Sequence, residues 1–157
     1  MVTRFGEALS SSVFAGLMAV RALLRPVALG AHAICIDRSG KVLLVRHSYM
    51  RGWSLPGGGV GRGEPAVHAV VRELNEELGT FRAKAPVFVG LFTNRSGWAT
   101  NVVALYQFDE AEVEFRPNLE VREIVFCDPA NPPSGTTNGT RRRLAELVDK
   151  TLPAPFW

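Results

Sequence analysis

The chain has 157 residues, of which 46% are hydrophobic and 21% are charged. These values exclude disordered, collagen-like and coiled-coil proteins, and they predict a single globular domain whose core needs no disulfide bonds. The formal net charge is +3, and 15 of the 18 basic residues are arginines. Because guanidinium groups bind phosphate through paired hydrogen bonds, this composition is compatible with a phosphate-bearing partner.

Cysteine use and the N-terminal residues bear on the compartment. Cys35 and Cys127 lie far apart within apolar runs, a placement typical of free, buried thiols, so we expect a reducing, cytoplasmic location. Val13–Val20 is apolar like the core of a signal peptide, but arginines follow it and no cleavage site does. The run is also far shorter than the roughly 20 residues of a transmembrane helix, so we expect no transmembrane segment.

The first predicted element is a helix over residues 5–24, which ends before Pro26. It divides the chain into an N-terminal helical extension over residues 1–25 and a main domain over residues 26–157. We expect this helix to pack on its own domain or on a second subunit in a homodimer. Arginines flank its apolar residues, so an amphipathic helix on a membrane surface is the alternative.

The main domain begins with two strands, Val27–Asp37 and Lys41–His47, which are rich in apolar and β-branched residues. The residues between them, Asp37-Arg-Ser-Gly40, favour a tight turn and therefore a β-hairpin. Tyr49–Gly63 contains many glycines and is predicted to be a loop.

The clearest helix is predicted over Glu64–Leu78. Its apolar residues recur at helical spacing, Pro65 falls in its first turn and Gly79 follows its end. Three strands follow, at 85–93, 100–108 and 121–128, then a loop over 129–139 and a short C-terminal helix. Strands alternating with helices predict an α/β protein.

Several other polar residues have simpler interpretations. Arg141–Arg143 begin the last helix and are expected to be a solvated face, with a nucleic-acid-binding patch as the alternative. The acidic run 109–114 is expected to form an exposed turn or strand edge. The histidines lack the spacing of zinc ligands, and the two cysteines form no CxxC pair.

The central helix carries the chemistry. Glu73, Glu76 and Glu77 fall on the side opposite the apolar stripe, and Arg72 is their one local partner. Like charges at this spacing oppose a helix by about 0.2–0.5 kcal/mol per pair. A divalent cation such as Mg²⁺, which prefers oxygen ligands, would remove this repulsion.

The loop before this helix supplies backbone groups. Trp53-Ser-Leu-Pro-Gly-Gly-Gly59, followed by Gly61 and Gly63, has few Cβ atoms, so its carbonyl or amide groups can approach a metal or a phosphate closely. We therefore expect the loop and the helix to form one site that takes a metal and a phosphate.

The spacing Gly58-x5-Glu64-x7-Arg72-Glu73-Leu74-x-Glu76-Glu77-x-Gly79 resembles the signature of the Nudix hydrolases. The family has an aliphatic residue at the next position, where this chain has Thr80, and no metal ligand depends on it. The resemblance implies a Nudix-type α/β/α sandwich with a mixed β-sheet.

The resemblance also implies roles for individual residues. Glu73, Glu76, Glu77 and the carbonyl of Gly57 would bind Mg²⁺ or Mn²⁺. Arg72 would orient the glutamates, Glu64 would support the loop or coordinate the metal through water, and Gly58 and Gly79 would be structural. A further acidic residue is expected just before or in the last strand, where Glu120 fits best and Glu123 second.

The implied activity is hydrolysis of a phosphoanhydride bond in a nucleoside diphosphate linked to another group, by an activated water. Its catalytic residues would be Glu73, Glu76, Glu77, Arg72 and Glu120. The alternative is a Nudix-fold module that binds nucleotides without turnover. Candidate contacts to the base and phosphates of the substrate are Tyr49, Arg51, Trp53, Phe92, Arg95 and Trp98.

Overall fold

The computed structural model describes residues 16–20, 23–24, 26–96 and 99–157. Its elements in chain order are β1 (Val27–Ile36), β2 (Val42–His47), β3 (Gly57–Gly59), α2 (Ala66–Leu78), β4 (Thr80–Arg82), β5 (Val87–Ser96), β6 (Ala99–Asp109), β7 (Glu112–Glu114), β8 (Val121–Cys127) and α3 (Asn138–Asp149).

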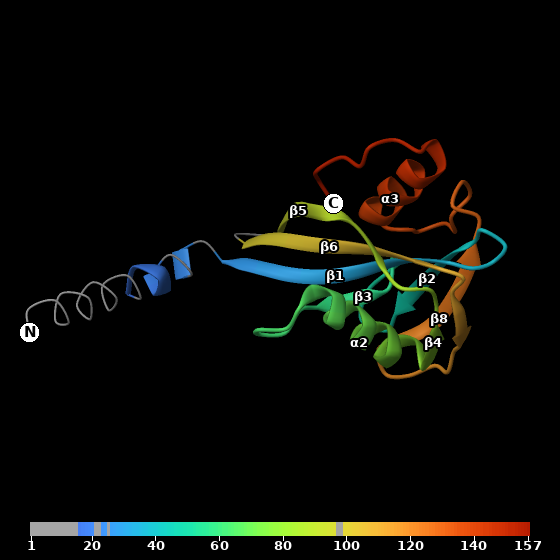
Figure 1. Cartoon of the computed structure of the whole chain (residues 1–157), viewed down its shortest axis with the longest axis horizontal. Coiled ribbons are helices and arrows are strands. Elements are labelled where there is room, and N and C mark those ends of the chain that lie inside the picture. The colour runs from blue at the N-terminus through green and yellow to red at the C-terminus, as the bar shows by residue number, and fades with distance from the viewer. Residues whose placement is uncertain (1–15, 21–22, 25, 97–98) are drawn as a thin grey trace, which may run out of the picture.

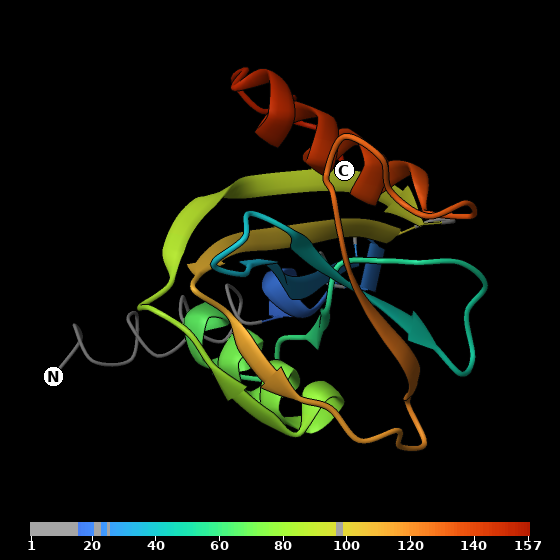
Figure 2. The same ribbon diagram turned by 90° about the vertical axis from the view of Figure 1, so that its right-hand side faces the viewer.

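A six-stranded sheet forms the centre of the molecule, in the order β5-β6-β1-β2-β8, with β3 paired to β1. The sheet is mixed, because β1 is parallel to β6 and antiparallel to β2. Helices α2 and α3 cover its opposite faces, as both views show (Figures 1 and 2). The predicted α/β/α sandwich is confirmed.

Both faces of β1 from Ala31 onward and of β2 up to Val45 are largely buried, which explains the nearly continuous apolar sequences of these stretches. Successive side chains of a strand point to opposite faces. Cys35 and Leu43 belong to the core under α2, whereas their neighbours Ile34 and Leu44 belong to the core under α3. A sheet covered on both sides lacks the polar alternation of a half-exposed sheet, and only His32, Arg46 and His47 interrupt the apolar sequences of these two strands.

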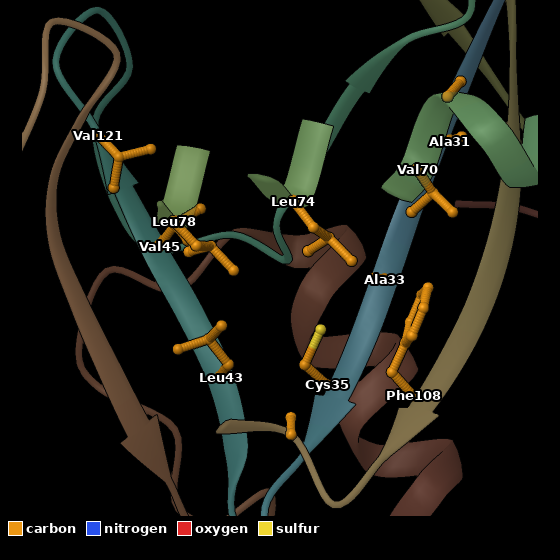
Figure 3. Packing of buried hydrophobic residues seen from close by; sticks show 12 residues of the cluster. Ala31, Ala33, Cys35, Leu43, Val45, Val70, Leu74, Leu78, Phe108 and Val121 are labelled. Atoms are coloured by element: carbon orange, nitrogen blue, oxygen red, sulfur yellow. The ribbon is translucent and has the colours of Figure 1, made fainter. Parts of the chain in front are cut away.

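The apolar stripe of α2 determines how this helix lies on the sheet. Val70, Leu74 and Leu78 are fully buried and pack above Cys35 and Leu43 (Figure 3). Each such side chain contributes about 1.5–3 kcal/mol to folding. Cys35 is a free, buried thiol, as its sequence context predicts. With this stripe buried, other sides of α2 carry its glutamates.

The hairpin between β1 and β2 forms as expected. Ile36 pairs with Val42, and the Asp37 carboxylate accepts hydrogen bonds from the backbone N–H groups of Ser39 at 2.8 Å and Lys41 at 2.9 Å. The prediction pairs β1 only with β2, however, whereas in the structure β6 pairs with β1 along the whole length of β1.

Two short strands, β3 and β4, are absent from the sequence-based prediction, and β7 lies within the acidic run 109–114, which is predicted to be an exposed turn or strand edge. The most consequential is β3, predicted to be loop because it consists of three glycines. It pairs with β1 through Gly57 opposite His32. Gly57 has φ +130°, and a Cβ there would collide with the carbonyl oxygen of Ala31. Only glycine lets the loop approach β1 closely enough to pair.

The C-terminal residues correct one prediction. Arg143 is not solvated: it is 2% exposed and donates hydrogen bonds to the carbonyls of Ala154 at 3.2 Å and Phe156 at 3.1 Å. Arg142 also donates to the carbonyl of Phe156, at 3.0 Å. Trp157 and Pro155 continue the attachment by pairing with Thr93 of β5. The arginines therefore fasten the C-terminal residues to the sandwich.

Most of the predicted N-terminal helix lies outside the described residues. Within it, residues 16–20 and 23–24 are helical and exposed. Among the described residues, no helix is both long and apolar enough to cross a membrane. The boundary at residue 25 and the packing of this extension stay predictions.

Candidate active site

Arg72 organises the carboxylates of α2 and of the loop before it. Its Nε donates to Glu64 Oε1 at 2.9 Å, and its Nη1 donates to Glu73 at 2.9 Å and to Glu76 at 3.1 Å. Its Nη2 donates to the carbonyl of Gly59 at 3.0 Å. One guanidinium thus joins three carboxylates and the glycine loop.

Glu64 supports the loop directly. Besides binding Arg72, its carboxylate accepts the N–H of Gly61 at 2.8 Å. The hydrogen bonds from Arg72, and then that from Gly61, lower the pKa of Glu64 from 4.5 to about 2. The carboxylate therefore stays charged, and the ion pair that holds the loop persists, far into the acidic range.

Glu77 differs from the prediction that all three glutamates share the side of α2 away from the core. It is 2% exposed. His47, at the end of β2, and the glycine loop cover this side of the helix. Nε2 of His47 lies 2.7 Å from Oε1 of Glu77, and the Gly57 N–H donates to Oε2 at 2.9 Å.

The glycine loop lies directly on Glu73. A Cβ at Gly58 would be 2.5 Å from the Cδ atom of the Glu73 carboxylate, a distance at which one of the two groups must move. Burial raises the pKa of Glu73, the charges of Glu77 and Glu76 raise it further, and Arg72 opposes this shift. Glu73 is thus a partly desolvated carboxylate with two like-charged neighbours.

This donor set suits a hard divalent cation. Glu73, Glu76, Glu77 and the backbone of Gly57 offer only oxygen ligands, and a cation would relieve the repulsion that raises the pKa of Glu73. Among the described residues, no group of three or more His, Cys, Asp or Glu side chains is already arranged around a metal position. Arg72 and His47 hold the carboxylates instead.

The loop before β8 brings Glu120 to the same end of α2. The Asn118 side chain donates to the carbonyl of Glu77 at 3.0 Å and accepts the N–H of Glu120 at 2.9 Å. Burial and the charges of Glu77, Glu120 and Glu73 raise the pKa of Tyr49, so its phenol lies in the electric field of all three carboxylates. Glu123, the second choice, is instead paired with Arg46.

The candidate substrate contacts divide into three groups. Tyr49 and Arg51 line a pocket beside β8, and Trp53 is half-buried under the guanidinium of Arg46. Phe92 is 2% exposed, and the centroid of its ring lies 4.0 Å from Cζ of Arg143 on the α3 side. This position favours a packing role. The remaining two candidates are not placed, because Trp98 and the side chain of Arg95 lie outside the described structure.

Sequence reasoning missed His47 and Asn118. For His47 a pattern was available, because residues 43, 45 and 47 of β2 point to the same face and only the last is polar. A lone polar residue on a buried face needs a polar partner. Asn118 offered no such pattern, since its loop has no regular spacing.

An α/β/α sandwich with a carboxylate helix against a glycine loop defines a recognisable class of protein. The family model of the NUDIX domain matches residues 26–147, and the chain belongs to this family. Among solved structures, the MutT NUDIX hydrolase from Burkholderia pseudomallei has a TM-score of 0.69 at 24% identity, covering 78% of this chain and 99% of that one. The MutT protein from Methanosarcina mazei Go1 has a TM-score of 0.66 at 22% identity, covering 80% and 96%. Both show the shared fold.

Curated relatives match over shorter segments. A Bacillus subtilis (strain 168) protein with the provisional name 8-oxo-dGTP diphosphatase is 40% identical over 63 residues, 40% of this chain and 42% of that protein. The RNA pyrophosphohydrolase of Gluconobacter oxydans (strain 621H) is 36% identical over 64 residues, 40% of this chain and 34% of that protein. The matches therefore span less than half the length of these relatives.

Proposed function

We propose that this protein is a divalent-metal-dependent pyrophosphohydrolase that cleaves a phosphoanhydride bond in a nucleoside diphosphate linked to another group. The observation that carries the proposal is the arrangement of Glu73, Glu76 and Glu77 around Arg72 and under the glycine loop, at the signature positions of the family. The names of the relatives, a diphosphatase and a pyrophosphohydrolase, support the same reaction class.

Glu73, Glu76, Glu77 and the Gly57 carbonyl would hold Mg²⁺ or Mn²⁺. When bound, the ion would act as a Lewis acid toward water and the phosphate oxygens. The chain's own groups do the positioning. Arg72 orients Glu73 and Glu76 through Nη1, and the Gly57 N–H fixes Glu77.

Glu73 is suited to accept a proton as well as to bind the metal. Its raised pKa, caused first by burial, makes it a stronger base than an exposed glutamate. The glycine loop shields it on one side, because Gly58 leaves no gap over the carboxylate. We infer that Glu73 takes the proton of the attacking water in addition to its place in the ligand set with Glu76, Glu77 and the Gly57 carbonyl.

The two free, buried cysteines support a reducing setting, so we place the reaction in the cytoplasm. The substrate we expect there is a small nucleotide derivative, and nothing in the composition requires a nucleic-acid partner.

The test is a panel of compounds with Mg²⁺, scored by products: nucleoside and deoxynucleoside triphosphates, ADP-ribose, NADH, nucleotide sugars and dinucleoside polyphosphates. On the best substrate, Glu76→Gln and Glu77→Gln should lower kcat by about 100-fold or more. Glu112→Gln, which removes an exposed carboxylate paired with Arg38, is the matched control and should leave kcat within about two-fold.

Unchanged turnover in both Gln variants, with the fold verified by circular dichroism, would refute the catalytic assignment. If no compound is hydrolysed while nucleotides still bind, the protein is a binding module instead.

A further inference from the structure

A pocket of about 500 Å³ lies between the loop that follows β2 and the start of β8. Figure 2 shows this loop projecting beyond the end of β2, on the side of the molecule where β8 begins. The residues that line this pocket include three arginines, one histidine and one tyrosine: Arg46, Arg51, Arg122, His47 and Tyr49.

Its three arginines are not equivalent. Arg46 is paired with Glu123, and its guanidinium lies 5.5 Å from the centroid of the Trp53 ring. Arg51 and Arg122 are exposed, and neither forms an ion pair with any residue that the structure describes. The pocket therefore presents two positive charges that no carboxylate of the described chain neutralises.

The pocket adjoins the carboxylate site through one side chain. His47 lines the pocket, and its Nε2 atom lies 2.7 Å from Oε1 of Glu77. Tyr49 lies against the same imidazole, with 5.1 Å between ring centroids, and its phenol is within electrostatic range of Glu73 and Glu77. A negative and a positive site thus lie next to each other, separated by the His47 ring.

A substrate with several phosphates needs both the carboxylate site, which holds a cation, and a surface that carries positive charge itself. The carboxylates of α2 can approach phosphate only through a cation, since like charges repel at close range. Phosphates beyond the cleaved bond therefore need direct cationic partners, and guanidinium groups are the donors best matched to phosphate oxygens.

We propose that Arg51 and Arg122 form an anion subsite that binds a phosphate group lying beyond the cleaved anhydride, which makes the preferred substrate a nucleoside triphosphate. This inference rests on the proposed function, which determines which end of the substrate faces the arginines. The subsite discriminates against substrates such as nucleotide sugars, whose diphosphate ends in a neutral group and leaves the arginines without a partner.

Binding of inorganic tripolyphosphate to the metal-free protein in EDTA, followed by calorimetry, tests the subsite without turnover. Arg51→Gln and Arg122→Gln should each raise the Kd about ten-fold, the loss expected for a hydrogen-bonded charge pair. Arg82→Gln is the matched control, because it removes the same charge from an exposed position on β4, outside the pocket. Its Kd should change less than two-fold.

Orthophosphate and a nucleoside without phosphates complete the binding series. Tripolyphosphate should bind more tightly than orthophosphate, and the nucleoside should not respond to the arginine substitutions. If Arg82→Gln weakened tripolyphosphate binding as much as the pocket variants do, net charge alone would explain the effect and the subsite would be refuted. An unchanged Kd in both pocket variants would also refute the subsite.

Turnover separates this inference from the proposed function. In an active enzyme, the pocket variants should raise KM for a nucleoside triphosphate about ten-fold relative to KM for a nucleotide sugar. A protein that hydrolyses nothing but loses tripolyphosphate binding in the variants keeps the subsite and refutes the hydrolase. An active protein whose binding and KM ratio are both unaffected refutes the subsite alone.

Discussion

The two faces of the sheet use arginine in opposite ways. Under α3, Arg143 is buried and its hydrogen bonds go to backbone carbonyls and to Glu146, over the ring of Phe92. On α2, Arg72 is 38% exposed and is shared by three carboxylates.

The difference lies in the charge balance. The charge of Arg143 is matched by one carboxylate and by carbonyl dipoles, although its buried Nε has no hydrogen-bond partner among the described residues. Around Arg72 the carboxylates outnumber the guanidinium three to one, and buried Glu77 adds a further carboxylate. Balanced charge accompanies a structural role, and unbalanced charge marks the face where a cation and a substrate are expected.

Arg143→Met should destabilise the α3 side of the sheet, and of the substitutions it should have the largest effect on stability. Removing this buried charge takes the Arg143 donors away from the carbonyl of Ala154. Glu146 and the carbonyl of Phe156 each lose one donor and keep another, from the Ala154 N–H and Arg142. We expect the free energy of unfolding to fall by about 3 kcal/mol. Urea unfolding measures it. Arg142→Met, whose guanidinium is exposed and also bonds Phe156, is the control and should cost less than about 1 kcal/mol. Equal losses in both variants would mean that burial of Arg143 contributes nothing.

The same contrast explains which parts of the site could be predicted from the sequence. Arg72, Glu73 and Glu76 lie within two turns of one helix, so helical spacing alone brings them together. The glycine loop precedes them directly in the chain. The ion pairs of Arg72 thus follow from local sequence, and the structure has them where the spacing predicts.

Contacts between distant segments were beyond such reasoning. His47 and Glu77 are 30 residues apart in the chain, and no periodicity of α2 predicts that His47 would bury one of its glutamates. Likewise, β3 forms only because β1 provides a backbone partner for three glycines. Arg143 looks like a surface residue until Ala154 and Phe156 fold over it.

On the α2 face, a divalent cation should stabilise the fold by relieving the carboxylate excess. At a Mg²⁺ concentration ten times its Kd, the free energy of unfolding should rise by about 1.4 kcal/mol and Tm by about 3–6 °C. Thermal unfolding with and without Mg²⁺ measures this shift, which should vanish in Glu76→Gln and persist in Glu112→Gln. An identical rise in Glu76→Gln would place the cation elsewhere.

The smallest expected effect concerns acid. Because Arg72 lowers the pKa of Glu64 from 4.5 to about 2, this ion pair stabilises the folded state above pH 4.5 and loses that contribution as the pH falls toward 2. In Arg72→Met the pKa of Glu64 should return toward 4.5, removing this acid-dependent contribution. Carboxyl-carbon NMR titration measures the pKa in both proteins. Glu110, whose pKa is lowered by Lys84, should titrate identically in both. A Glu64 that already titrates near 4.5 in the unaltered chain would show that the Arg72 network does not hold the loop in solution.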